Sequence, residues 1–237
     1  MIDKKNEKLA IGWCDNGTVD GKFMDGILNT ILNPDIHGMN IIDKIRVSGN
    51  QIGRQRQTLF DMWSDLVKTD WLLWVDSDIV LTPEVLKILC DTADKNNKPV
   101  VSGLYFISKQ SEQTLMQPYA AIFHESDDEE LKIIHPVPEN SIFKIDSAGF
   151  GILLMHKSII HKIRSVDPDY SIFAEKQGIG DEYVSEDIAF FRKLKKTKIP
   201  LYVNTQAHVE HIKRFSFDHN FYNLYWNGID KNLIIQK

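Results

Sequence analysis

The feature that most constrains the fold is a short apolar run that leads directly into two aspartates. Trp71–Val75 contains no polar residue, which is typical of a strand buried on both faces of a parallel α/β sheet. Asp76 and Asp78 follow at once, and residues two apart in an extended chain point to the same side. Because the carboxyl ends of such strands bind ligands, we expect both carboxylates at the rim of the sheet, where a divalent cation would relieve their repulsion.

Strand and helix patterns alternate along the first half of the chain. Strands are expected at 9–14, 41–47, 71–75 and 100–106, and helices at 21–32, 58–67 and 83–96. This alternation predicts a parallel sheet with helices on both faces. In the second half we expect a hairpin with arms at 120–123 and 131–134, a buried strand at 152–155, helices at 156–166 and 185–196, and a last strand at 201–203. We expect both halves to share one sheet.

Composition narrows the class of protein further. The 28 basic and 33 acidic residues give a formal charge of -5, which does not favour a general nucleic-acid binder. Cys14 and Cys90 form neither a metal-binding spacing nor a disulfide framework. The first residues are polar and lack a signal-peptide core, and no apolar run approaches the roughly 20 residues that cross a bilayer. We therefore expect a cytoplasmic protein without a transmembrane segment.

The stretch around the two aspartates resembles the Asp-X-Asp signature of glycosyltransferases with the GT-A fold. Gly53–Leu59 is similar to the segment that opens a helix in many of these enzymes, including fungal mannan-type mannosyltransferases, with glutamine in place of the usual asparagine. The resemblance continues through Ser147–Met155, Ser185–Asp187 and Val209–His211. It implies one GT-A-like α/β domain with a mixed central sheet. Residues 1–108 would form a Rossmann-like half that binds metal and nucleotide, and residues 109–237 the half that binds the acceptor.

The resemblance also implies a metal cofactor, Mn²⁺ or Mg²⁺, held by Asp76 and Asp78. A cation there would bridge the two phosphates of a nucleotide-sugar donor, a UDP- or GDP-sugar, and stabilise the charge of the leaving diphosphate. A late histidine in the family is a further metal ligand, and His211 matches it better than His208. An imidazole ligand would favour manganese. The alternative is that His211 is an ordinary surface histidine.

Two acidic residues are candidates for catalysis. Transfer of a hexose to a hydroxyl acceptor, such as a glycan, requires a base that removes the acceptor proton. Glu186 and Asp187 resemble the acidic pair of inverting family members, with Asp187 as the preferred base. Acidic residues after the expected helix cap, Ser185, also fit a simple interaction with the helix dipole. In a retaining enzyme the pair would position the acceptor instead.

The remaining candidates are expected to bind the nucleotide-sugar. They lie in the loop after the first strand, in the segment that opens the second helix, around the two aspartates, in the glycine loop before the buried strand, and beyond the last strand. They are Cys14, Asp15, Asn16, Arg54, Arg56, Asp76, Ser77, Asp78, Gly149, Phe150, Gly151 and Arg214.

Two other classes of protein remain open. Asp76–Val80 also matches the Asp-X-Asp motif of haloacid-dehalogenase-type phosphatases, although here the motif comes late in the chain. A nucleotide-sugar-binding module without catalysis is the second alternative. Release of phosphate from generic phosphoesters would favour the phosphatase, and EDTA-sensitive hydrolysis of a nucleotide-sugar would separate an enzyme from a binding module.

Overall fold

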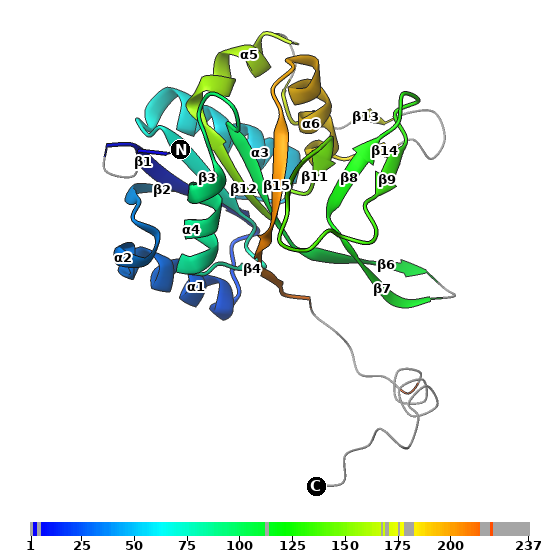
Figure 1. Cartoon of the computed structure of the whole chain (residues 1–237), viewed down its shortest axis with the longest axis horizontal. Coiled ribbons are helices and arrows are strands. Elements are labelled where there is room, and N and C mark those ends of the chain that lie inside the picture. Colours follow the sequence, from blue (N-terminus) through cyan, green and yellow to red (C-terminus); the bar gives the residue numbers. More distant parts are fainter. Residues whose placement is uncertain are drawn as a thin grey trace, which may run out of the picture.

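The computed structural model describes residues 2–3, 6–111, 114–166, 168, 171–174, 176–177, 183–213 and 219. Its centre is a seven-stranded sheet that lies between two layers of helices (Figure 1). Within the described residues no helix is both long and apolar enough to cross a membrane.

The central sheet is mixed. Its strands, in spatial order, are β10 (Ile142–Ile145), β15 (Leu201–His208), β5 (Val100–Leu104), β12 (Ile152–His156), β3 (Trp71–Val75), β1 (Lys8–Asp15) and β2 (Asn40–Ser48). β1, β2 and β3 run parallel, as do β5 and β15, while β12 lies antiparallel between β3 and β5 and β10 antiparallel to β15. The predicted GT-A-like α/β class with a sheet shared by both halves is confirmed.

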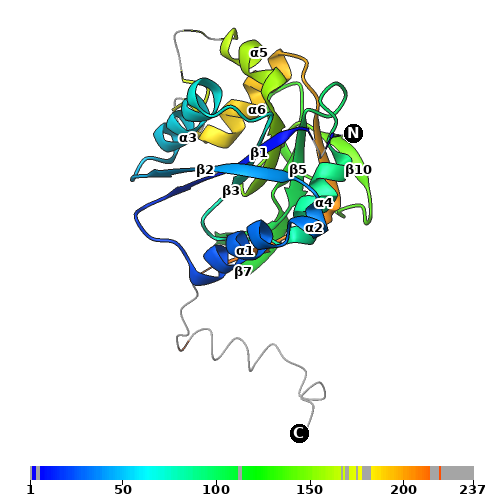
Figure 2. The ribbon, with the colours of Figure 1, turned by 90° about the vertical axis from the view of Figure 1, so that its left-hand side faces the viewer.

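Helices cover both faces of this sheet, as Figure 2 shows. One face carries α1 (Gly21–Leu32), α2 (Pro34–His37) and α4 (Pro83–Thr92). The other carries α3 (Ile52–Asp61), its π-helical continuation η1 (Met62–Leu66), η2 (Lys157–Ile159), α5 (Ile160–Arg164) and α6 (Glu186–Lys196). Each layer buries its own apolar core because alternate residues of a strand point to opposite faces. Trp74 of β3 enters one core, whereas Trp71 and Leu73 enter the other.

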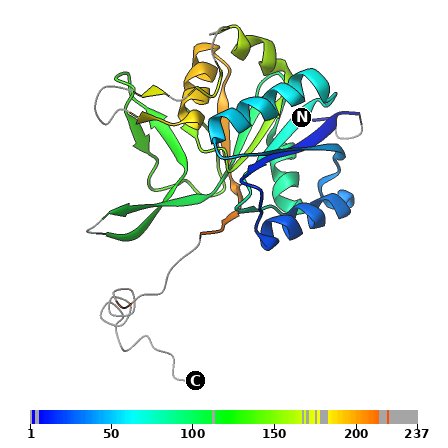
Figure 3. The ribbon, with the colours of Figure 1, turned by 180° about the vertical axis from the view of Figure 1, so that it is seen from behind.

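Short strands extend the sheet at the carboxyl ends of β3 and β15. β4 (Ile79–Val80) pairs with β16 (Glu210–His211), and the hairpin of β6 (Phe106–Ser111) and β7 (Thr114–Ala120) projects beyond the helices (Figure 3). A further small sheet contains β11 (Ser147–Ala148), β8 (Ile122–Glu125) and β9 (Leu131–Ile133). β13 (Lys176–Gln177) and β14 (Tyr183–Val184) form the last pair.

Some predicted boundaries are confirmed, but α4 ends at Thr92 and not at residue 96, and the helix predicted at 156–166 is divided into η2 and α5 and ends at Arg164. α1 covers the expected residues, and α4 begins after Thr82, whose Oγ1 accepts a hydrogen bond from the backbone N–H of Val85 at 3.3 Å. The prediction for the second helix was wrong at its start, because α3 begins at Ile52 and includes the whole Gly53–Gln57 segment. The polar residues Gln55 and Arg56 are accommodated there because both side chains find buried partners.

Two further predictions need correction. The strand expected at 100–106 ends at Leu104, and Phe106 begins a separate strand, with the buried Tyr105 between them. Ser185 does occupy the N-cap position of α6, but its side chain makes no capping hydrogen bond. Its hydroxyl instead donates to the Asp187 carboxylate, so the Ser185 side chain does not cap the helix as the sequence predicts.

Candidate functional site

The candidate site lies beyond the carboxyl end of β3, where the chain turns from Asp76 into β4. The backbone N–H of Asp76 donates to the carbonyl of Gly151 at 3.0 Å, and the N–H of Ile79 donates to the carbonyl of Asp76 at 3.0 Å. These two bonds fix a tight turn that leaves Asp76, Ser77 and Asp78 only partly buried. The turn therefore presents both carboxylates at the rim of the sheet, as the sequence predicts.

The structure brings His211 to Asp78 across 133 residues of chain. β16 pairs with β4 so that His211 lies opposite Ile79, and the Ile212 N–H donates to the Asp78 carbonyl at 2.7 Å. The His211 Nε2 lies 3.0 Å from Asp78 Oδ2, and the Lys213 Nζ lies 2.9 Å from the same oxygen. Burial raises the pKa of Asp78, but hydrogen bonds from His211 and Lys213 outweigh burial and hold that pKa below its usual value.

The second ring nitrogen of His211, Nδ1, shows why Asp78 and His211 together could hold a cation. Its Nδ1 lies 2.8 Å from the carbonyl oxygen of Phe106, and a carbonyl can only accept, so Nδ1 carries a hydrogen. Nε2 then donates to Asp78 only if the ring carries a second proton, and in the neutral ring it presents a lone pair to the carboxylate. Two facing acceptors are stable together only with a proton or a cation between them. A metal-ligating histidine with its second nitrogen bonded to a carbonyl is the usual arrangement around protein-bound metals.

The three predicted metal ligands are not gathered into one cluster. Within the part of the chain that the structure describes, no group of three or more His, Cys, Asp or Glu side chains is arranged to hold a metal. Asp78 and His211 meet, whereas both oxygens of Asp76 lie 3.2 Å from Nη2 of Arg56. His208, the alternative ligand, ends β15 with an exposed side chain. A metal role for Asp76, Asp78 and His211 stays a prediction.

Arg56 joins the predicted metal residues to the predicted catalytic residues. Its guanidinium is buried, with Nη2 on Asp76 and Nη1 on Glu186 Oε1 at 2.7 Å. The guanidinium carbon also lies 4.7 Å from the centre of the Phe150 ring, close enough for a cation–π interaction. Burial lowers the pKa of Arg56, but Asp76 and Glu186 raise it above the ordinary value. Arg56 is therefore a permanent positive charge at the centre of the site.

Glu186 and Asp187 begin α6 next to this charge. Burial raises the pKa of Glu186 above its usual value, Arg56 opposes the shift, and Asp187 adds to it. The Asp187 Oδ1 accepts hydrogen bonds from Ser185 and from the Ile188 N–H at 2.8 Å. The side chain of Asp187 is partly exposed, in contrast to that of Glu186. Of the two, Asp187 is therefore better placed to meet a molecule that enters from solvent.

The glycine loop predicted to lie beside the donor packs on a residue that the sequence analysis missed. Tyr105 is 6% exposed, and its hydroxyl accepts a hydrogen bond from the Gly151 N–H at 3.2 Å. Phe150 is 1% exposed and packs among Trp74 and Phe190. Its ring packs against the Arg56 guanidinium. A direct contact between this ring and a ligand stays a prediction.

Cys14 and Asp15, which are predicted to contact the nucleotide, lie buried at the end of β1. The Asp15 carboxylate is buried and accepts five hydrogen bonds from the side chains of Trp13, Arg46 and Ser48 and the backbone N–H of Gly17. The Arg46 guanidinium holds the pKa of Asp15 well below its usual range. Burial raises the pKa of the Cys14 thiol to about 12. Donor contacts by these two side chains stay predictions.

The other candidates differ in exposure. Asn16 is exposed, and its side-chain oxygen accepts from Thr18 at 3.0 Å. Arg54 is exposed at the start of α3 and has no hydrogen bond or ion pair within the described residues. Arg214 lies outside the described residues, as does most of the segment between Ala174 and Tyr183.

A cavity lies at the opposite edge of the sheet. It has a volume of about 320 Å³ and is lined from β10, α6 and the start of β15, including Lys144, Asp146, Lys195 and Lys198. Because β15 begins there, this cavity faces away from the carboxyl ends of the strands. None of the predicted site residues lines it.

Comparisons with known proteins bear on the fold of this chain. No model of a known protein family matches the chain. The mannan polymerase complex subunit MNN9 of Candida albicans is 29% identical over 118 residues, which are 48% of this chain and 30% of that protein. The crystal structure of GalNAc-T7 with UDP, GalNAc and Mn²⁺ superposes with a TM-score of 0.57 at 11% identity, over 90% of this chain and 45% of that one.

A glycosyltransferase involved in glycosylating the major capsid of PBCV-1 matches 83% of this chain and 81% of that one, with a TM-score of 0.40 and 16% identity, too distant to add to the argument. The match to MNN9 spans less than a third of that protein, and the match to GalNAc-T7 less than half. The chain therefore has a GT-A-like glycosyltransferase fold and resembles one fungal glycosylation protein in sequence over about half its length.

Proposed function

We propose that this chain is a metal-dependent glycosyltransferase that moves a hexose from a nucleotide-diphosphate sugar to a hydroxyl acceptor, a glycan. The observation that carries the proposal is a pair of charged contacts at the turn after β3: Asp78 meets His211, and Asp76 meets Arg56, which also binds Glu186. Arg56 thereby joins a residue expected to bind the donor to a residue expected to handle the acceptor, which a simple nucleotide-binding module would not need.

The cofactor would be Mn²⁺ or Mg²⁺, held by Asp78, His211 and Asp76. When bound, it would neutralise the diphosphate of the donor. The protein adds two cations of its own near the same place, the buried Arg56 and the exposed Lys213. Both would offset the negative charge that develops as the nucleoside diphosphate departs.

Asp187 would act on the acceptor. As the acceptor oxygen bonds to the anomeric carbon of the hexose, the bond from that carbon to the phosphate oxygen breaks. The acceptor proton passes to the Asp187 carboxylate, and the bonding electrons leave with the nucleoside diphosphate. Ser185 and the Ile188 N–H occupy one oxygen of Asp187, which leaves the other oxygen to receive the proton.

The comparisons support this class of donor and acceptor. GalNAc-T7 was crystallised with UDP, GalNAc and Mn²⁺, and MNN9 is named as a subunit of a mannan polymerase complex. We therefore propose a UDP- or GDP-sugar as donor and a glycan as acceptor.

The test is release of nucleoside diphosphate from a panel of UDP-, GDP- and dTDP-sugars, with Mn²⁺ or with EDTA and with simple glycosides as acceptors. We expect metal-dependent release from one donor, and a loss of about 100-fold or more in Asp78→Asn and Asp187→Asn. Arg164→Gln, on the surface near Asp65, is the matched control.

Three outcomes would contradict the proposal. Donor binding without release in any acceptor mixture would indicate a binding module. Release of inorganic phosphate from generic phosphoesters would indicate the phosphatase. Full activity of Asp78→Asn, or in EDTA, would remove the metal role.

A further inference from the structure

We infer that Tyr105 is a positioning residue that holds His211 and the Gly149–Gly151 loop in one fixed arrangement. This inference rests on the proposed function for its ligand, but its structural part is tested separately. Tyr105 falls between β5 and β6, where the chain leaves the central sheet and enters the projecting hairpin. One side of its ring faces the predicted metal ligand, and its hydroxyl faces the loop.

The first contact is with the loop. The Tyr105 hydroxyl accepts a hydrogen bond from the Gly151 N–H, and the Gly151 carbonyl in turn accepts from the Asp76 N–H at 3.0 Å. The Gly149 N–H bonds to the Ala121 carbonyl, and the Ala121 N–H to the Tyr105 carbonyl, each at 3.0 Å. Tyr105 is therefore bonded to this loop directly through its side chain and indirectly, by way of Ala121, through its backbone. A shift of Tyr105 would pass through Gly151 to the backbone of Asp76.

The close approach of the Tyr105 side chain also explains why positions 149 and 151 are glycines. A Cβ atom built on Gly149 would lie 1.8 Å from the Tyr105 hydroxyl oxygen, and one built on Gly151 would lie 2.6 Å from Tyr105 Cζ. No side chain fits at either position while the phenol stays where it is. The spacing Gly149-Phe150-Gly151 is thus a requirement of the buried tyrosine, with Phe150 pointing to the opposite core.

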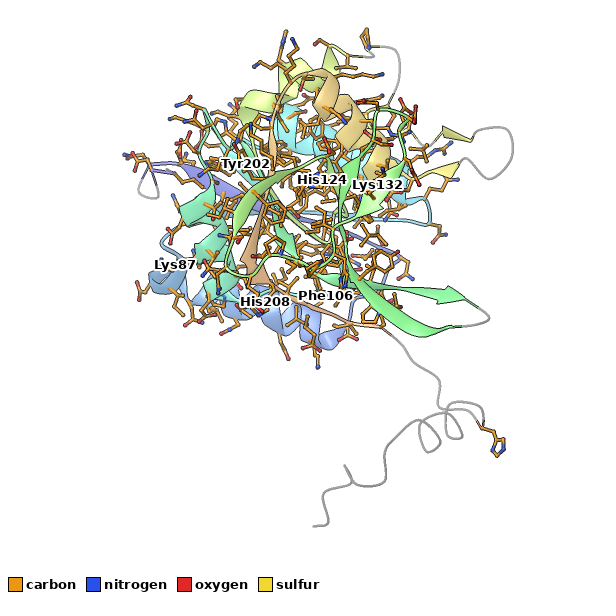
Figure 4. The ribbon with its side chains drawn as sticks, turned by 45° about the vertical axis from the view of Figure 1, so that its right-hand side comes forward. Lys87, Phe106, His124, Lys132, Tyr202 and His208 are labelled. Atoms are coloured by element: carbon orange, nitrogen blue, oxygen red, sulfur yellow. The ribbon has the colours of Figure 1, made fainter. Side chains whose placement is uncertain are left out.

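The second contact is with His211. The ring of Tyr105 meets the ring of His211 edge to face, with centroids 5.2 Å apart and planes at 87°. The next residue, Phe106, provides the carbonyl that receives the His211 Nδ1 hydrogen; Figure 4 labels Phe106 where the β6–β7 hairpin leaves the body of the protein. Two consecutive residues therefore set both the orientation and the tautomer of His211. Such supporting contacts around metal ligands typically affect metal affinity by roughly 10- to 100-fold.

The phenol is also suited to remain neutral. Burial raises the pKa of Tyr105 above its ordinary value, and the negative charge of Asp76 raises it further. A neutral hydroxyl can accept from Gly151 without placing an additional negative charge beside Asp76. Tyr105 therefore contributes geometry to the site and leaves its charge unchanged.

The first measurement follows the His211 ring nitrogens by NMR without metal or nucleotide, and assigns them with His211→Gln. Tyr105→Phe keeps the ring contact and should leave the His211 signals close to wild type. Tyr105→Leu removes the contact and should shift them. Tyr202→Leu, a partly buried tyrosine of β15 that Figure 4 labels apart from Phe106, is the control and should not shift them.

A double substitution adds a sharper test. Gly149→Ala should displace Tyr105 and shift the His211 signals, and Tyr105→Phe should partly rescue it because the closest clash is with the hydroxyl oxygen. Gly21→Ala, where a new Cβ meets nothing within 4 Å, is the matched glycine control. If Tyr105→Leu and Gly149→Ala both leave His211 unchanged, the inference is wrong whatever the chain catalyses.

The second measurement is Mn²⁺ affinity in the presence of UDP or GDP, read by electron paramagnetic resonance. We expect Tyr105→Leu to weaken binding by roughly 10- to 100-fold and Tyr202→Leu to leave it unchanged. Unchanged affinity in Tyr105→Leu, with wild type binding normally, would overturn the inference. Absence of binding in wild type would instead contradict the proposed function, and the NMR result would still decide whether Tyr105 positions His211.

Discussion

Two aspartates at the carboxyl ends of neighbouring strands have opposite surroundings. β1 and β3 lie side by side and parallel, with Asp15 ending one and Asp78 following the other. The Asp15 side chain is fully buried and accepts five hydrogen bonds, whereas the Asp78 side chain is 40% exposed and meets one histidine and one lysine. A carboxylate offers about four lone-pair sites. In this structure protein donors occupy all the acceptor sites of Asp15, whereas Asp78 keeps some of its sites open.

This difference distinguishes a carboxylate whose acceptor sites are occupied by protein donors from one with acceptor sites still open. Asp15 ties the end of β1 to Arg46 and Ser48 of β2, and Gln55 of α3 completes the same corner. Among the described residues, the Asp78 carboxylate meets only the side chains of His211 and Lys213, both on the same oxygen, so its other oxygen is open to a cation. The expected position of a residue at a strand end is therefore insufficient to assign it to a ligand, and its existing hydrogen bonds must be counted.

The largest expected effect on stability is at Asp15. Asp15→Ala would leave the Trp13 indole N–H and the Gly17 N–H without their acceptor and break the pair with Arg46, which should cost about 3 kcal/mol of unfolding free energy. Urea denaturation measures it. Asp78→Ala, with a partly exposed carboxylate, should change stability by less than about 1 kcal/mol. Equal losses in the two variants would contradict the comparison.

Acid titration should show the same contrast. Because the folded-state pKa of Asp15 is depressed, its stabilisation is fully present above the unfolded value of about 4 and is lost as pH falls toward the folded value. Wild type should therefore lose stability below about pH 4 more steeply than Asp15→Asn. Parallel pH profiles of the two proteins, measured by urea denaturation, would show that Asp15 is not held by Arg46.

A smaller effect is expected at Gln55. Its Nε2 donates to the carbonyls of Asp15 at 2.7 Å and of Val47 at 3.1 Å. Gln55→Ala removes one hydrogen bond from each carbonyl, although the Asp15 carbonyl keeps its bond from the Gly49 N–H at 2.9 Å, and it should cost about 1–2 kcal/mol. Gln57→Ala, two residues further along α3, is a useful comparison because its partners, the side chains of Asp61 and Ser171 and the backbone N–H of Ile172, all lie outside that corner. If Gln55→Ala lowers the unfolding free energy by no more than about 0.5 kcal/mol, other contacts hold the ends of β1 and β2 against α3.

The smallest effect concerns the reactivity of Cys14. Its buried thiol, with a pKa of about 12, should remain protonated and resist iodoacetamide at pH 8 in the native protein. Mass spectrometry of alkylated peptides should show modification only after denaturant is added. Rapid labelling under native conditions would mean that the end of β1 is open to solvent.

The sequence predicted those parts of the site that depend on local pattern. The apolar strand, the two aspartates and the capped helix after them are contiguous, so Asp76 and Asp78 were recognisable at the rim. The saturation of Asp15 was not, because its donors Arg46 and Ser48 lie 31 and 33 residues further along. The antiparallel insertion of β12 also depends on pairing between distant segments.

Tyr105 was missed for the same reason. Its partners Gly151 and His211 are 46 and more than 100 residues away in the chain. The signal that could have found it is the pair of glycines around Phe150, which indicates that something bulky approaches closely. That signal does not say which residue approaches. Likewise, Arg56 was expected to reach a nucleotide, and its link between Asp76 and Glu186 required the fold.

The most direct test of the account is calorimetric titration of Mn²⁺ in the presence of UDP or GDP, comparing wild type with Asp78→Asn. Asp65→Asn, an exposed carboxylate paired with Arg164, is the control. We predict saturable binding in wild type and in the control, and none in Asp78→Asn at the same protein concentration. Binding of equal affinity in Asp78→Asn would show that the cation lies elsewhere and would contradict the account.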